Sequence, residues 1–176
     1  MTAPTDDLFH ESEEFCDEFF AAICRDTGNP YSKDARKRLK GELHSSCSRT
    51  TFKFVNGGAG VHSTACLVKW LTRPGVDVTV NRVNLHGNLI RDLGAKAVLK
   101  LLEAVPSITS LNIGCNDISH DGAIAIAHEL KSNMTLRTLI VGSDSGGSHP
   151  NHLNEQVSPS PGADVGRGRA QSRCRF

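Results

Sequence analysis

The 176-residue sequence lacks the features of membrane, secreted and zinc-binding proteins. No apolar run approaches the roughly eighteen residues that cross a bilayer, so no membrane span is predicted. The N-terminus carries no basic region followed by an apolar stretch, so no secretory signal is predicted. The six cysteines include no C-x-x-C pair and are expected to be reduced thiols. We therefore expect a cytoplasmic protein, with the nucleus as the alternative location.

Neither positive nor negative charge predominates overall, because the formal net charge is +1. Residues 1–20 contain acids but no lysine or arginine, residues 33–40 are mostly basic, and the last ten residues include four arginines. A near-neutral chain gives no general argument for an anionic partner. We expect neither nucleic acid nor a membrane as the partner. Apolar residues make up 38%, so we expect the core to use only part of the chain.

What the sequence does contain is an internal repeat with a period of 28 residues. On this shift Asn88 falls on Asn116 and Gly94 on Gly122, and the next shift takes Leu111 to Leu139. Each unit reads L-x-L-x-x-N-x-I-x-x-x-G and continues with apolar residues at helical spacing. The L-x-L segment predicts a strand in which alternate residues face the core. The pattern therefore predicts parallel strands near 83–86, 111–114 and 139–142, the first two followed by helices.

The polar residue of each unit predicts a ladder of buried side chains at Asn88, Asn116 and Asp144. A side chain at this position can bond to backbone groups of neighbouring units, which a bend leaves without partners. Asp92 and Ser119 are predicted to cap the two helices that follow.

The repeat resembles leucine-rich repeat proteins of the ribonuclease-inhibitor type, and the resemblance covers residues 83–144. It implies an α/β leucine-rich repeat solenoid of about three β-α units, with parallel strands on a concave face used to bind proteins. We delimit the repeat segment as 49–144, including an irregular first unit with a strand at 52–54 and a helix at 63–71.

The flanks are interpreted as a helical N-terminal segment, 1–48, and a disordered C-terminal tail, 145–176. One amphipathic helix is expected at 11–25. A second helix is expected to start at Asn29-Pro30 and to run through about Leu43. They are interpreted as a hairpin that caps the first unit, and the alternative is a docking helix for a partner groove. The strand at 139–141 is expected to be the last regular element. Its open edge predicts self-association or marginal folding, and we favour a truncated longer repeat protein.

No assembled catalytic, metal or cofactor site is recognised, so the chain is interpreted as a non-enzyme. The segment Gly57-Gly58-Ala59-Gly60 lacks the third glycine of a dinucleotide site and the lysine of a P-loop. His149 and His152 have no acid or cysteine close by in sequence and are expected to be solvated.

The leading hypothesis is a protein-interaction scaffold that uses the concave face of the repeats. The alternative is a regulator of an enzyme such as a small GTPase, which would bind through the repeat loops. Strand alternation predicts which side chains form the face. These are Arg82, Asn84, His86, Ser110, Asn112, Thr138 and Ile140.

Overall fold

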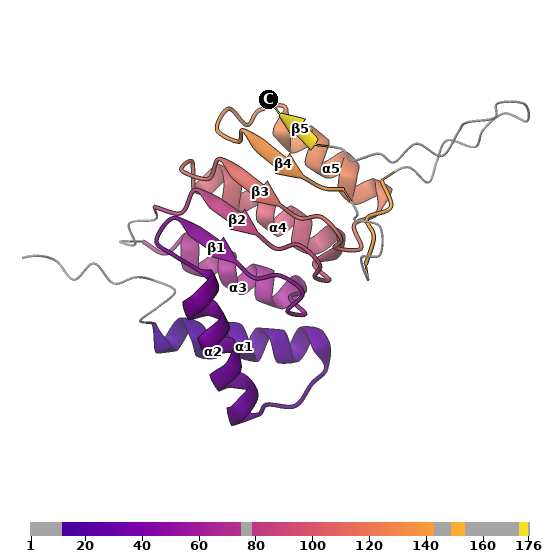
Figure 1. Ribbon diagram of the computed structural model, residues 1–176. Helices are drawn as coiled ribbons and strands as arrows, with labels where there is room; N and C mark the ends of the chain where they lie inside the picture. The colour runs from indigo at the N-terminus through magenta and orange to yellow at the C-terminus, as the bar shows by residue number, and fades with distance from the viewer. Residues whose placement is uncertain (1–11, 75–78, 143–148, 154–172, 176) are drawn as a thin grey trace, which may run out of the picture.

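The computed structural model describes residues 12–74, 79–142, 149–153 and 173–175 (Figure 1). Helices and strands alternate through most of this range. In chain order they are α1 (Glu13–Thr27), α2 (Lys33–Ser46), β1 (Thr51–Lys53), α3 (Val61–Leu71), β2 (Arg82–Asn84), α4 (Arg91–Ala104), β3 (Ser110–Asn112), α5 (His120–Leu130), β4 (Thr138–Ile140) and β5 (Arg173–Arg175). Within the described ranges, no helix is long and apolar enough to cross a lipid bilayer.

The first four strands form a parallel sheet in sequence order. Their central residues pair in register and are all buried, because alternate strand positions face the core. These residues are Phe52, Val83, Leu111 and Leu139. The predicted parallel strands and their 28-residue spacing are thus confirmed, and the longer first unit adds a fourth strand.

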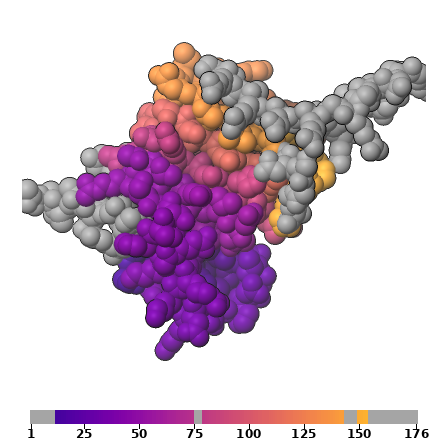
Figure 2. Space-filling view, viewed as in Figure 1, coloured from indigo at the N-terminus to yellow at the C-terminus, as the bar shows by residue number. Residues whose placement is uncertain are grey.

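The helices α3, α4 and α5 lie together on one side of this sheet, and α1 and α2 stand beside its β1 end (Figure 1). The surface shows the same order as successive bands of colour from the N-terminal helices to β4 (Figure 2). The molecule is therefore a stack of β-α units. One face of the sheet lies under the helices and the other is left uncovered by them.

The N-terminal helices cover the first unit through aromatic packing. Phe15 and Phe19 of α1 stack at 5.3 Å between ring centroids, and both meet Phe52 of β1 edge to face. Phe15 also contacts Trp70 of α3 at 5.6 Å. A buried aromatic cluster of this kind stabilises by its large apolar area. The helical pair at 13–46 thus closes the open side of the first unit.

The start of α2 differs from the expectation at Asn29-Pro30. The helix begins at Lys33, and the Ser32 hydroxyl accepts a hydrogen bond from the Ala35 N–H, as an N-cap does. Pro30 therefore precedes the helix and is not in its first turn.

The N-cap position of α4 also differs from the expectation, because Ile90 occupies it without a side-chain bond. Asp92 instead accepts hydrogen bonds from the N–H and hydroxyl of Ser119 at the start of α5.

Asn88 and Asn116 lie inside the stack with exposed fractions of 1% and 0%. The Asn88 carbonyl oxygen accepts from the N–H groups of Gly57 and Ala59, each at 3.0 Å. The Asn116 amide donates to the carbonyls of Leu85 and Gly114, each at 2.9 Å. Each asparagine thus joins its own unit to the preceding one, and this satisfies backbone groups that the loops leave without partners.

The third rung of this ladder is Asn151. Its carbonyl oxygen accepts from the N–H groups of Asn116 and Ile118, at 2.8 and 3.0 Å. Its amide donates to the carbonyls of Ile113 and Val141. The predicted third rung, Asp144, lies outside the described residues, and the rung beside Asn116 is filled seven positions later than the strict period expects.

The strand β4 is not the last regular element, contrary to the expectation for 139–141. β5 pairs with it antiparallel, with Leu139 opposite Cys174. The segment 149–153 also packs against the stack through backbone hydrogen bonds. The Asp117 N–H donates to the His149 carbonyl, and the His152 N–H donates to the Ile118 carbonyl. The expectation of disorder over 145–176 does not hold for these two segments, and the rest of that range lies outside the described residues. The edge of β4 predicted to be open is therefore paired.

Candidate functional site

The candidate site is the face of the parallel sheet opposite the helices α3, α4 and α5, here called the sheet face. It consists of the strand positions that flank the buried central residues, together with His86 just after β2. Its residues are Thr51, Lys53, Arg82, Asn84, His86, Ser110, Asn112, Thr138 and Ile140. Lys53 and Arg82 are exposed and the others are half-buried.

The strand register brings the predicted face residues together in rows. Arg82 pairs with Ser110, which pairs with Thr138. In the next row Asn84 pairs with Asn112, which pairs with Ile140. Neighbouring strands are about 4.8 Å apart, so each row is a run of adjoining side chains. The predicted residues therefore form one continuous surface.

Sequence reasoning missed the contribution of β1 to this surface. Thr51 pairs with Arg82 and Lys53 pairs with Asn84, so β1 extends both rows by one residue. The signal was present in the alternation Phe52-Lys53-Phe54, in which the two phenylalanines are buried and the lysine is exposed.

Two asparagines of the face are held by their own backbones. The Asn84 carbonyl oxygen accepts from the His86 N–H at 3.1 Å, and the Asn112 carbonyl oxygen accepts from the Gly114 N–H at 3.0 Å. Such local bonds are common where asparagine ends a strand or begins a turn. The bonds fix the orientation of both carboxamides, so the centre of the sheet face is pre-organised.

Beyond these asparagines the strands approach each other closely. A Cβ at Gly114 would lie 2.6 Å from the Gly142 carbonyl oxygen and 3.1 Å from His86 Nδ1. Real Cβ atoms do not tolerate such contacts with backbone, so glycine is required at this position. In the row formed by His86, Gly114 and Gly142, only His86 has a side chain beyond a hydrogen atom. The sheet face is therefore recessed beside β3 and β4 in this row.

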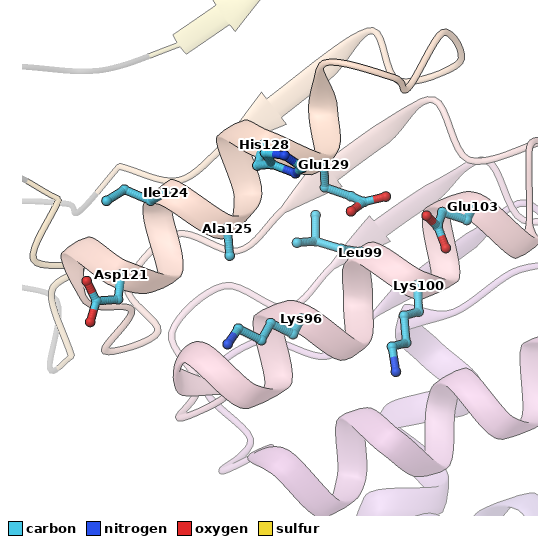
Figure 3. Close-up of a pocket in the computed structure, with 9 residues that line it drawn as sticks. All are labelled: Lys96, Leu99, Lys100, Glu103, Asp121, Ile124, Ala125, His128 and Glu129. Carbon is cyan, nitrogen blue, oxygen red and sulfur yellow. The ribbon is translucent and has the colours of Figure 1, made fainter.

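A second surface lies on the helix side, as a groove of about 660 Å³ between α4 and α5 (Figure 3). Leu99 and Ala125 point toward each other from the two helices, and Ile124 nearby is 55% exposed. Glu103 hydrogen-bonds with Glu129, and this bond and the like charge raise the pKa of Glu103. Lys96 and Lys100 also line the groove. Its charges are therefore mixed and partly repel one another.

The glycine-rich loop before α3 is already occupied by a carboxylate of the protein. Asp26 of α1 accepts hydrogen bonds from the N–H groups of Gly60, His62 and Ser63, at 2.8–2.9 Å, and from the Ser63 hydroxyl at 2.6 Å. A helix N-terminus favours an anion at this position. Asp26 supplies that anion, so the loop serves to attach α1 to α3.

The cysteines and histidines do not assemble a metal site in the described part of the chain, where no group of three or more candidate ligands occurs. His152 lies 3.9 Å from Asp117, and His120 Nδ1 lies 3.4 Å from the Leu153 carbonyl. Burial raises the pKa of the Cys16 thiol and raises the pKa of Cys66 to about 11. These thiols are protonated at neutral pH, which lowers their reactivity.

A family model described as Leucine Rich repeat matches residues 106–127, which contain β3, the Asn116 rung and the first part of α5. No curated protein matches the sequence. The chain therefore carries a leucine-rich repeat at the centre of its β-α stack.

Proposed function

We propose that the chain is a protein-interaction scaffold, not an enzyme, and that it binds its partner on the sheet face. We further propose that its repeats are of the ribonuclease-inhibitor type and form a short solenoid. The support is the 28-residue spacing of Val83, Leu111 and Leu139, together with a helix after each of the first three strands.

The single observation that carries the proposal is the pre-organised polar surface on the side of the sheet opposite the helices. Its side chains stand in two rows of four, and its two asparagines are fixed by bonds to the backbone. A rigid surface loses little conformational entropy when a partner binds. Ile140 adds an apolar position, while the hydroxyls and amides supply hydrogen-bond donors and acceptors.

The proposal is tested by blocking the face with a large side chain. The variant Ser110→Trp places an indole in the row formed by Thr51, Arg82, Ser110 and Thr138. The variant Ile124→Trp places the same group in the groove between α4 and α5. Partners captured by the wild-type chain are compared with those captured by each variant. We expect Ser110→Trp to lose them and Ile124→Trp to retain them.

Loss of the partners with Ile124→Trp alone would assign binding to the helix-side groove and refute the proposal. Retention by both variants would also refute it. Matching unfolding midpoints for the two variants and the wild type would show that the losses reflect binding and not unfolding.

A further inference from the structure

The charged side chains of the sheet face are of one sign. Lys53 on β1 and Arg82 on β2 are both exposed, and they occupy diagonal positions of the paired strands. A strand spacing of about 4.8 Å and a rise of about 3.3 Å per residue put their Cα atoms roughly 8 Å apart. The two cations therefore form one patch, whereas no acid occupies an outward position of β1–β4.

These two cations differ from the basic residues that hold the N-terminal helices. Arg36 pairs with Glu13 and Asp17, and Lys69 pairs with Glu18. For Lys53 and Arg82, the described portion of the molecule contains no ion-pair partner. Among the described residues, the positive charge of the sheet face is thus not paired with a carboxylate.

Neutral hydrogen-bonding groups continue from this patch along both rows. Ser110 and Thr138 follow Arg82, and Asn112 follows Asn84. Hydroxyl and amide groups can donate to carboxylate oxygens, and an arginine can bind a carboxylate through two parallel hydrogen bonds. At the far edge, the backbone register sets Arg173 opposite Ile140 and Arg175 opposite Thr138.

We infer that the sheet face binds an acidic segment of a partner protein, with carboxylates placed against Lys53 and Arg82. This inference rests on the proposed function and specifies the partner's chemistry. An opposite charge on the partner would speed association and select against basic partners. A nucleic acid fits less well, because the outward positions of β1–β4 include no aromatic side chain on which bases could stack.

The test measures binding of a fluorescently labelled poly-glutamate peptide by anisotropy at low and at physiological salt. The double variant Lys53→Glu/Arg82→Glu is compared with Lys96→Glu/Lys100→Glu, which makes the same charge change on α4. We expect the first to weaken binding by about tenfold or more and the control by less than about threefold. The neutral pair Lys53→Gln/Arg82→Gln should give an intermediate loss and serves if the reversed variant does not fold.

Equal weakening by both double variants, or no binding of the peptide to the wild type, would overturn the inference. Tighter binding of a labelled poly-lysine peptide or of a single-stranded oligonucleotide would also overturn it. The proposed function is tested separately by the variant Ser110→Trp, which blocks the sheet face without changing its charge. Partner loss with Ser110→Trp but not with the charge reversal would leave the scaffold function standing without the acidic partner.

Discussion

At the scale of single residues, the ladder asparagines show why a polar side chain is retained in an apolar stack. Asn116 is fully buried, yet its amide and carbonyl groups bond to Leu85, Gly114 and Ile90 of its own and the preceding unit. A buried polar group without a partner is costly, whereas a bonded one is not. The asparagine therefore fixes the stacking of units as well as filling space.

Replacing Asn116 with leucine should lower the free energy of unfolding by about 1–3 kcal/mol, because backbone groups lose their partners. The control is Asn29→Leu in the loop between α1 and α2, where the side chain is exposed and the expected change is within about 0.5 kcal/mol. Denaturant unfolding of both variants measures the difference. An equal effect of the two substitutions would show that Asn116 does not bond across units.

A second residue-scale prediction concerns Glu18, which accepts hydrogen bonds from Trp70 Nε1 and Lys69 Nζ, both at 2.8 Å. The bonds to Lys69 and then to Trp70 lower the pKa of Glu18 below its usual 4.5. Since the folded-state pKa is depressed, the stabilisation is present above pH 4.5 and is lost as pH falls through the folded-state value.

Trp70 is the single tryptophan, so its fluorescence reports this contact directly. We expect its emission to change in a titration below pH 4.5, and Glu18→Gln to remove that change. Glu42, an exposed acid of α2, supplies the control variant Glu42→Gln, which should leave the titration as it is. A titration that persists in Glu18→Gln would contradict the assignment.

At the scale of elements, helix starts are joined to neighbouring elements by carboxylates. Asp26 at the end of α1 caps α3, and Asp92 in α4 bonds to Ser119 at the start of α5. The sequence predicted Ser119 as a cap, and its hydroxyl does accept from the Asp121 and Gly122 N–H groups. The prediction that Asp92 caps α4 is wrong. Spacing in the sequence points to the nearest helix start, whereas Asp92 bonds to the start of α5, which is its neighbour in space.

Substituting Asp26 with alanine should cost about 1–2 kcal/mol of stability, because three N–H groups at the start of α3 lose their acceptor. The amides of His62 and Ser63 should exchange faster in this variant. Asp34→Ala in the exposed first turn of α2 is the control and should leave both rates unchanged. Slow exchange in Asp26→Ala would mean that the loop is held without α1.

The sequence predicted the elements with a regular period and missed those without one. Strands β2, β3 and β4 follow from the 28-residue spacing, because the same buried position recurs in each unit. Asn151 was missed because seven additional residues precede it, although Asn151-His152-Leu153 repeats the pattern of Asn116-Asp117-Ile118. β5 has no periodic signal, and its pairing with β4 depends on residues far apart in the chain.

At the scale of the whole molecule, the two ends of the stack are completed differently. Aromatic side chains of α1 cover the β1 end, whereas β5 and the Asn151 segment complete the β4 end. Near that second end a hollow of about 330 Å³ is lined by Leu130, Asn133, Met134, Leu136 and Arg137, and Met134 is 93% exposed. The self-association predicted from an open edge of β4 loses that basis, since β5 pairs with this edge.

The measurement that tests the central claim most directly is a hydroxyl-radical footprint of the chain with and without a captured partner. Oxidation rates are compared at His86 and Ile140 on the sheet face, at Ile124 and His128 of α5, and at Met134 in the loop after α5. Binding on the sheet face predicts protection of His86 and Ile140 with unchanged rates at the other three. Protection of Ile124 and His128, with His86 and Ile140 unchanged, would contradict it.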